Sequence, residues 1–252
     1  MNRAIGLVVA LNAEATALLG RGRWHHAEGH LFRHSRLTTH THLFVARSGI
    51  GRKNALLASQ WLINEGVGAL GVSGISGGLN PELKSGDLIL ADSVIQDNGG
   101  TCKQTWKGSP QFVDNAHAAL IAKGIPAYRG LIVTVQNPVL SARSKQALFS
   151  KTNALAVDME SAAVARVAHD KGVPFFAVRA VCDPATRSIP DDLFDCINQK
   201  GQVRIFYLLR MLFLNPAIIS ELFRTKGELG AALTGLRRAW NRAVRDILPS
   251  LL

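Results

Sequence analysis

Cysteine is scarce in this 252-residue chain. Its three cysteines, Cys102, Cys182 and Cys196, are an odd number with no Cys-x-x-Cys spacing. This argues against a disulfide framework and a zinc knuckle, and it fits a reducing cytoplasm. The chain also lacks internal repeats and a Gly-X-Y period, which excludes solenoid and collagen-like proteins. Because 47% of the residues are hydrophobic and only 19% are charged, the chain can bury a full core, and global disorder is excluded.

Acidic residues are also in short supply. Eighteen Asp and Glu stand against 29 Lys and Arg, which gives a formal net charge of +11. Such a chain should attract a polyanion or an anionic membrane surface. A nucleic-acid-binding protein is one interpretation of this charge. We expect no nucleic-acid partner, because the chain has no basic stripe interleaved with aromatics and only 6% aromatic residues.

No apolar run reaches the roughly 18 residues that a membrane-spanning helix needs. The run Ile5–Leu11 follows Arg3 and resembles a short signal peptide. Because Asn12 and Glu14 follow at once and no small-residue cleavage site closes the run, a buried first strand is the better interpretation. We therefore expect a cytoplasmic protein, with peripheral binding to the inner face of the membrane as an open alternative.

Short apolar runs alternate with helical stretches over residues 1–200, which predicts an α/β catalytic domain. The predicted strands are 5–11, 43–46, 69–73, 87–94, 130–135, 154–157 and 175–181. The predicted helices are 13–19, 53–65, 115–123, 142–149 and 159–171. Residues 201–252 are expected to form a separate helical tail.

Six of the eight histidines lie within residues 20–42, a polar stretch that predicts a hairpin. They are His25, His26, His30, His34, His40 and His42. A metal site needs three or four converging ligands, and the one acidic residue in this stretch is Glu28. We therefore interpret these side chains as solvated hairpin histidines and expect no metal.

The tail contains an apolar stretch, Ile205–Leu214, and a basic helical run, Leu229–Leu248. One flank of that run is apolar at helical spacing: Leu233, Leu236, Trp240, Val244 and Ile247. The other flank carries Arg237, Arg238, Arg242 and Arg245. A basic amphipathic helix with Trp on its apolar face suits an anionic membrane surface. The alternative is that the apolar stripe packs on the α/β core or in a dimer interface.

Three predicted strand ends carry glycines or isolated polar residues, which is where open α/β sheets place ligands. Glu14 follows the first strand in the first turn of a helix, where complementing the helix dipole would explain it equally well. The loops 48–51 (Ser-Gly-Ile-Gly) and 73–78 (Ser-Gly-Ile-Ser-Gly-Gly) can offer backbone N–H groups to an anion or a ribose. Neither loop matches a P-loop or a Gly-x-Gly-x-x-Gly motif.

The strongest stretch runs from residue 156 to residue 185. A strand leads into a helix whose first turn is expected to present Met159 and Glu160. A buried strand then delivers Arg179 and Asp183 to its carboxyl end, where capping of the strand end is the alternative role for Asp183.

These motifs resemble the purine nucleoside phosphorylase/uridine phosphorylase superfamily, and in particular its methylthioadenosine/S-adenosylhomocysteine nucleosidases. The matching segments occur in the same order: 10–14, 48–51, 74–79, 129–133, 157–160 and 178–183. Val-Asp-Met-Glu-Ser, the Asp-Pro-Ala turn and the basic tail are most similar to the hopanoid-associated phosphorylase branch. The resemblance implies an α/β fold with three αβα layers around a mixed, twisted central sheet. It also implies a homo-oligomer, a dimer or higher.

The resemblance implies cleavage of an N-glycosidic bond with release of adenine. The hopanoid branch is implied to act on adenosylhopane, a triterpenoid lipid that carries an adenosyl group; a soluble methylthioadenosine/S-adenosylhomocysteine nucleosidase is the alternative. Asp183 matches the acid that protonates adenine N7, and a carboxylic acid can do so near neutral pH only with a raised pKa. Glu160 matches the residue that binds the ribose hydroxyls, and Met159 matches the one that packs on the sugar.

The attacking nucleophile remains open between water and phosphate. Glu14 matches the glutamate that activates water in nucleosidases. Many phosphorylases carry an arginine just before the glycine loop, and this chain has Val72 at that position. We therefore favour water, with inorganic phosphate as the alternative co-substrate and no other cofactor. The water or phosphate site is assigned to Arg179, Ser48, Gly49, Ser76 and Gly77. The base pocket is assigned to Gly74, Val157, Pro138 and Val139.

Overall fold

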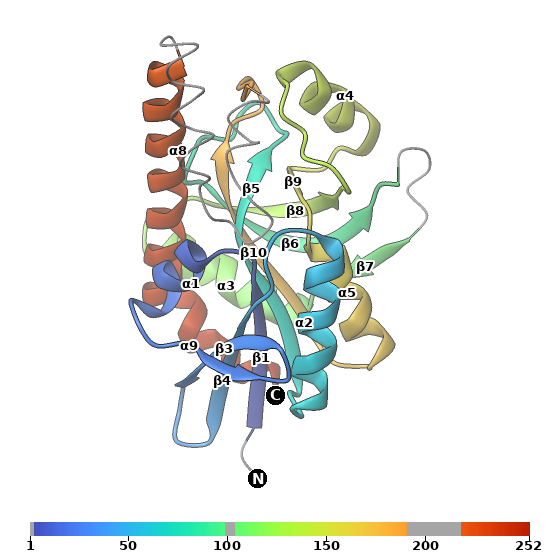
Figure 1. The fold of residues 1–252 in the computed structure, drawn as a ribbon, viewed down its shortest axis with the longest axis vertical. Helices are drawn as coiled ribbons and strands as arrows, with labels where there is room; N and C mark the ends of the chain where they lie inside the picture. Colours follow the sequence, from blue (N-terminus) through green and yellow to red (C-terminus); the bar gives the residue numbers. More distant parts are fainter. Residues whose placement is uncertain (1–2, 99–103, 191–217) are drawn as a thin grey trace.

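The computed structural model describes residues 3–98, 104–190 and 218–252, and its strands form one mixed sheet (Figure 1). The strands of this described part are β1 Arg3–Val9, β2 His25–Ala27, β3 His30–Arg36, β4 Thr41–Arg47, β5 Ala69–Gly78, β6 Leu88–Gln96, β7 Thr105–Lys107, β8 Ala127–Thr134, β9 Ala156–Asp158 and β10 Phe175–Asp183. The helices are α1 Asn12–Leu19, α2 Arg52–Asn64, α3 Pro110–Ala122, α4 Ala142–Thr152, α5 Ser161–Asp170, α8 Ile218–Ala239 and α9 Arg245–Ile247. A π-helical turn, Trp240–Val244, joins α8 to α9, and a 3-10 turn, Leu248–Leu251, follows α9.

The sheet curls so far that part of it closes. Its strand order is β10-β6-β8-β9-β5-β1-β4-β3-β2, and β10 also pairs with β5 in parallel. The strands β5, β10, β6, β8 and β9 therefore form a ring, and β1, β4, β3 and β2 extend the sheet from β5. β1 runs parallel to both β4 and β5, whereas β10 and β6 are antiparallel, so the sheet is mixed as expected.

Helices cover both faces of the sheet, which confirms the three αβα layers (Figure 1). One core cluster holds Ile5, Leu7 and Val9 of β1 with residues of α1, α3 and α8. Val8 belongs to a second cluster, with residues of α2 and α5. Successive side chains of a strand point to opposite faces, so a strand covered on both sides needs a continuous apolar run.

Most predicted elements are present, with shifted ends. β2 and β3 form the polar hairpin expected for residues 20–42. The helix expected over 115–123 is α3 and begins earlier, because Pro110 at its first position fits the fixed φ of proline. The glycine segment 73–78, expected as a loop, is the end of β5, where it pairs with β10. This loop prediction was wrong, because glycines without side chains allow close approach of neighbouring groups inside the sheet.

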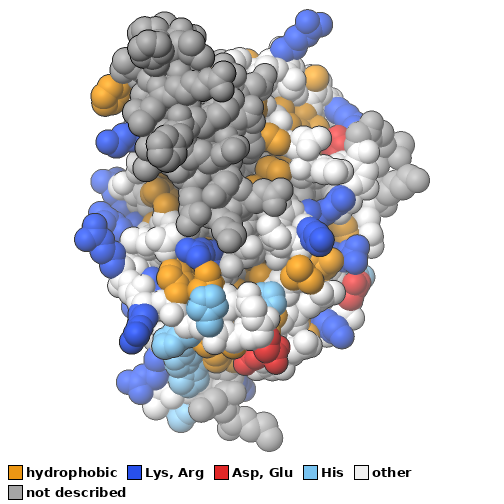
Figure 2. All heavy atoms as spheres, in the orientation of Figure 1, with side chains coloured by type: hydrophobic (Ala, Val, Ile, Leu, Met, Phe, Trp, Pro, Cys, Tyr) orange, Lys and Arg blue, Asp and Glu red, His pale blue; other side chains and the backbone are white. Residues whose placement is uncertain are grey.

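The end of the chain packs on the α/β core. The sequence left open whether the apolar stripe of the tail packs on the core or contacts a membrane. In the structure, Leu236, Trp240 and Val244 each expose 2% of their surface or less. They join the core cluster of α1 and α3, so core packing is the correct alternative for this stripe. The basic flank stays exposed, and Figure 2 shows Lys and Arg along the edge where α8 lies. The expected domain boundary at 200/201 and the apolar stretch Ile205–Leu214 lie outside the described residues.

Within the described ranges, no helix is both long and apolar enough to cross a bilayer.

Candidate active site

Four charged side chains meet beside the middle of β5 and β10, close to the ends of β1 and β9. They are Glu14, Asp158, Glu160 and Arg179, and we call them the arginine cluster. Arg179 is fully buried and its Nη2 lies 2.7 Å from Asp158 Oδ2 and 3.3 Å from Glu160 Oε2. An added Cβ at Gly74 would collide with Glu14 Oε1 and lie 2.7 Å from Arg179 Nη1, so Glu14 and Arg179 meet over this glycine.

Glu14 is buried, with 1% of its surface exposed. Its Oε2 accepts hydrogen bonds from the backbone N–H groups of Ala10 and Leu11, each at 2.8 Å. Its Oε1 accepts one from Ile75 N–H at 2.9 Å. The alternative of a surface glutamate that complements a helix dipole is therefore wrong, because the turn after β1 folds back around this carboxylate.

Asp158 organises the start of α5. Its Oδ1 accepts from Thr134 Oγ1 at 2.7 Å and from the backbone N–H groups of Glu160 and Ser161 at 3.3 and 3.2 Å. Glu160 therefore occupies the N-cap position, and Met159 lies in the preceding turn, half-buried. The expectation that Met159 and Glu160 stand in the first helical turn was wrong, because the helix begins at Ser161, two residues later than predicted, and Ser161 N–H donates to Asp158 Oδ1.

Burial and the shared arginine decide the protonation of the cluster. Burial raises the pKa of Glu160 to about 7, while Arg179 lowers it and Asp158 raises it further. Burial also raises the pKa of Glu14, against the lowering effect of Arg179 and three backbone N–H groups. The cluster can therefore exchange a proton near neutral pH, as general acid–base chemistry requires.

The glycine-rich segment after β4 holds the arginine cluster instead of presenting free N–H groups. Ser48 N–H donates to Val9 O at 2.9 Å, and Gly49 N–H donates to Ala10 O at 3.1 Å. Gly51 N–H donates to Glu160 Oε1 at 2.8 Å. Ser48 and Gly49 were assigned to a water or phosphate site; these two N–H groups are already used within the protein.

A second cluster surrounds Asp183 at the end of β10, and we call it the lysine cluster. Lys145 of α4 is fully buried and forms an ion pair with Asp183 Oδ2. Its Nζ also donates to the backbone oxygens of Pro184 and Arg187, each at 2.9 Å. Burial raises the pKa of Asp183, and the Lys145 ammonium partly offsets this. The Asp183 side chain keeps 13% of its surface exposed.

The β5 strand connects the two clusters. Gly77 lies next to Asp183, since an added Cβ there would be 3.5 Å from Asp183 Oδ2 and 3.1 Å from Val157 Cγ1. Gly74 and Gly77 are three residues apart, which is on the order of 10 Å along a strand. Ser76, also assigned to this site, is buried between them, with its hydroxyl 3.5 Å from Ala180 O.

An irregularity in β10 places Asp183. Val181 pairs with Ser76 and Asp183 pairs with Gly77, so Cys182 is an extra residue in β10. Bulges of this kind re-aim side chains near functional sites. Without the bulge, Asp183 would lie opposite Gly78 instead of Gly77.

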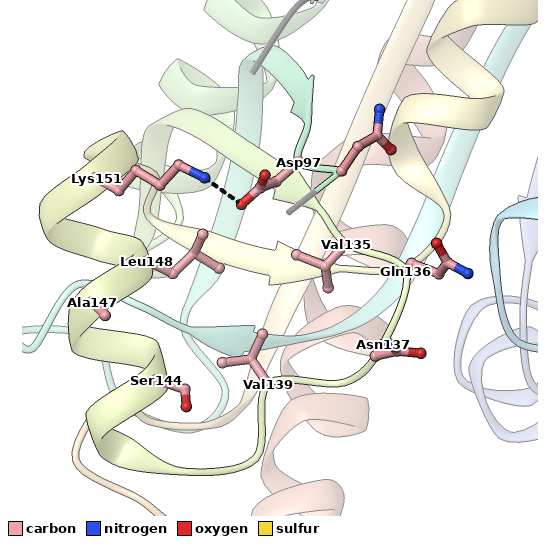
Figure 3. A pocket seen from close by; sticks show the side chains of 10 residues that line it. Asp97, Val135, Gln136, Asn137, Val139, Ser144, Ala147, Leu148 and Lys151 are labelled. Carbon is pink, nitrogen blue, oxygen red and sulfur yellow. Dashed lines mark hydrogen bonds and ion pairs between the residues drawn. The ribbon is translucent and has the colours of Figure 1, made fainter. Parts of the chain in front are cut away.

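A cavity of about 480 Å³ opens beside the loop that follows β8 (Figure 3). It extends between that loop and α4, with the Asp97–Lys151 ion pair on one side and Leu148, Val135 and Val139 around it. Val135 N–H donates to Asp158 O at 2.8 Å, so this loop is tied to the arginine cluster. Four residues were assigned to a base pocket. Val139 lines this cavity and Pro138 is half-buried, whereas Gly74 lies at the arginine cluster and Val157 lies next to Gly77.

Sequence reasoning missed Lys145, Asp158 and Thr134 as members of these clusters. Lys145 carried a signal, because it lies three residues before Leu148 on the side of α4 that the structure buries. A lysine on a buried helix face needs an anionic or carbonyl partner. In the described ranges, no group of three or more His, Cys, Asp or Glu could hold a metal ion, and His34 and His42 instead contact each other at 2.9 Å.

Residues 4–207 match the model of a protein family described as the phosphorylase superfamily. The match covers most of the chain and includes both clusters. The chain therefore belongs to the phosphorylase superfamily.

Solved structures show the same fold at low sequence identity. Futalosine hydrolase of Helicobacter pylori is 20% identical and superposes with a TM-score of 0.74, covering 98% of this chain and 98% of that one. The 5′-methylthioadenosine/S-adenosylhomocysteine nucleosidase of Helicobacter pylori is 21% identical with a TM-score of 0.71, covering 100% and 98%. The Neisseria meningitidis nucleosidase of the same name is 20% identical with a TM-score of 0.73, covering 98% and 99%.

Proposed function

We propose that this protein cleaves the N-glycosidic bond of an adenine nucleoside and releases adenine. The observation that carries the proposal is the arginine cluster, in which two buried glutamates and an aspartate converge on one arginine beside the β5 glycines. The lysine cluster supplies a further carboxyl group, Asp183 of β10, which lies beside Gly77, three residues along β5 from Gly74. This separation suits a nucleoside, with its sugar at the arginine cluster and its base at Asp183.

The proposed reaction has one proton transfer at each end of the substrate. An acid protonates the base, and a second group takes a proton from the attacking water. Asp183 gives its proton to N7 of the base while the electron pair of the C1′–N9 bond moves onto the base. The sugar becomes oxocarbenium-like, as in other glycoside cleavages. Water adds to C1′ and its proton passes to Glu14. Glu160 binds the ribose hydroxyls, and Met159 packs against the sugar.

Water is the proposed nucleophile because the cluster disfavours phosphate. Arg179 faces three carboxylates, so its charge is already compensated. The N–H groups of Gly49, Gly51 and Ile75 donate to protein oxygens. A phosphate dianion would therefore find neither a free arginine nor these N–H groups to bind it.

A lipid-linked nucleoside, adenosylhopane, is the proposed substrate. A basic surface supports this, because Arg245 of α9, Arg242 of the π-helical turn, and Arg237 and Arg238 of α8 are all exposed and can attract anionic lipid. Phe223, 68% exposed on α8, offers an apolar contact. The alternative is a soluble methylthioadenosine/S-adenosylhomocysteine nucleosidase, since two of the similar structures are nucleosidases of that name.

Adenine release from adenosylhopane and from methylthioadenosine, each with and without phosphate, tests the proposal. We expect adenine from adenosylhopane without phosphate. A sugar 1-phosphate formed only with phosphate would exclude water as the nucleophile. Preference for methylthioadenosine would favour the soluble nucleosidase, and release of adenine from neither would exclude the function.

The membrane part of the proposal has its own test. Changing Arg237, Arg238, Arg242 and Arg245 to Gln should weaken binding to anionic vesicles, by on the order of 1 kcal/mol for each arginine near the surface. Cleavage of the lipid-linked nucleoside should slow, whereas a short soluble adenosyl analogue should be cleaved as before. Equal vesicle binding by the variant and the original protein at physiological salt would remove the membrane from the proposal.

A further inference from the structure

Lys145 is buried among oxygen atoms alone. Its ammonium contacts Asp183 Oδ2, the backbone oxygens of Pro184 and Arg187 at 2.9 Å, and that of Asp183 at 3.4 Å. An ammonium has three N–H donors and no acceptor, so four surrounding oxygens satisfy its charged form. A buried charge of this kind needs such a partner set, because desolvation would otherwise neutralise it.

The groups around Asp183 come from three elements. Lys145 faces it from α4, and Glu228 acts on it from α8. Arg187, in the segment after β10, is buried and pairs with Glu228 at 3.2 Å and with Glu221 at 2.6 Å. The negative charge of Glu228 is therefore compensated by Arg187, which leaves Lys145 as the cation that contacts Asp183 directly.

We propose that Lys145 positions Asp183 for proton transfer and sets the upper pH limit of the reaction. The inference rests on the proposed function, in which Asp183 is the acid. The lysine holds Oδ2, which leaves Oδ1 as the oxygen to meet the base. Lys145 itself does not touch the substrate.

The effect of Lys145 follows from the charges in the transfer step. As the Asp183 O–H bond breaks and the N7–H bond forms, Asp183 becomes a carboxylate, and the adjacent ammonium stabilises it. Without the ammonium, burial would act on Asp183 with only the backbone hydrogen bond to oppose it, and the pKa of Asp183 would rise further. Asp183 would then be a weaker proton donor that stays protonated to higher pH.

The test compares Lys145→Met with the original protein across pH. We expect kcat to fall by up to about 100-fold, the loss that misplacing a catalytic group produces, with KM changed less than about threefold. We also expect the alkaline limb of the kcat/KM profile to move up by about one pH unit or more, since an adjacent opposite charge shifts a carboxyl pKa by that much. Arg143→Met removes an exposed positive charge from the same helix and should leave the profile unchanged.

A second measurement needs no substrate. The Asp183 carboxyl carbon, identified in ¹³C spectra by its loss in Asp183→Asn, should titrate at higher pH in Lys145→Met. If Lys145→Met does not fold, Lys145→Gln removes the charge but keeps a hydrogen-bond donor at this position, and the Asp183 titration is measured on that variant. An unchanged Asp183 midpoint would overturn the proposal whether or not the enzyme is active. Absence of adenine release by the original protein, with a shifted midpoint, would overturn the proposed function alone.

Discussion

The arginine cluster and the lysine cluster treat buried charge in opposite ways. Arg179 faces three carboxylates, so the arginine cluster carries excess negative charge, and one of its members, Glu160, has a pKa raised to about 7. In the lysine cluster a single carboxylate meets a single cation, and backbone oxygens satisfy the remaining donors. The first arrangement is suited to accepting and holding protons, and the second to placing one acid. The two arrangements lie three residues apart along one strand, β5, at Gly74 and Gly77.

Of the substitutions considered, Asp183→Asn in the lysine cluster should have the largest effect on turnover. An amide cannot donate the carboxyl proton, so turnover should fall by about two to four orders of magnitude while the fold is kept. Adenine release and thermal unfolding measure the two. Turnover within threefold of the original protein would remove Asp183 from the mechanism.

Glu14→Gln should break the arginine cluster's chemistry with the next largest effect. Without a carboxylate to take the proton of water, turnover should fall by on the order of 100-fold. The Gln amide oxygen can accept from Ala10 and Leu11 N–H while its NH2 group faces Ile75 N–H, so we expect a folded protein of lower stability. The measurement is adenine release with circular dichroism as the control. Full activity would place the base elsewhere.

Arg179→Met should separate stability from chemistry. Without Arg179, the carboxylates of Asp158 and Glu160 stay buried and lose their cationic partner. Breaking a buried ion pair in this way lowers the free energy of unfolding by about 3–5 kcal/mol. The loss should be smaller at pH 5, where Glu160 is protonated. Urea unfolding at pH 5 and pH 8 measures it. An equal loss at both pH values would contradict the raised pKa of Glu160.

Arg187→Met should act on the lysine cluster alone. Its side chain ties the segment after β10 to Glu221 and Glu228 of α8, and its backbone oxygen contacts Lys145. Loosening this segment should lower kcat by about tenfold, since misplacement of catalytic groups costs up to 100-fold. Glu160→Gln should change the free energy of unfolding by the same amount in the Arg187→Met variant as in the original protein. The readouts are steady-state kinetics and unfolding of the single and double variants.

The smallest expected effect is a pH dependence of stability, which should come from Glu160 of the arginine cluster. Glu160 has a folded-state pKa of about 7 against an ordinary value of 4.5. Its contribution is therefore fully present below about pH 4.5 and is lost as pH rises through 7. The original protein should lose stability over this window, and Glu160→Gln should lose less. Parallel curves of midpoint against pH for the two proteins would contradict this.

Local patterns in the sequence were enough for the elements and for several site residues. The apolar runs that became β1 and β10 predicted buried strands, because a strand covered on both faces must be apolar throughout. Glu14, Glu160, Arg179 and Asp183 were selected because they are polar residues at strand ends. Such positions are where α/β sheets place ligands, and the structure brings the first three together.

What the sequence determined by itself was the α/β class, the hairpin within residues 20–42 and the helix in the described part of the tail. Tertiary structure decided the rest. The bulge at Cys182 aims Asp183 at Gly77, the closure of the sheet through β10 and β5 assembles the arginine cluster, and α4 brings Lys145 to Asp183. It also decided that the stripe around Trp240 packs on the core. The physical reason is that burial and charge pairing depend on contacts between residues far apart in the chain, which no local pattern of residues encodes.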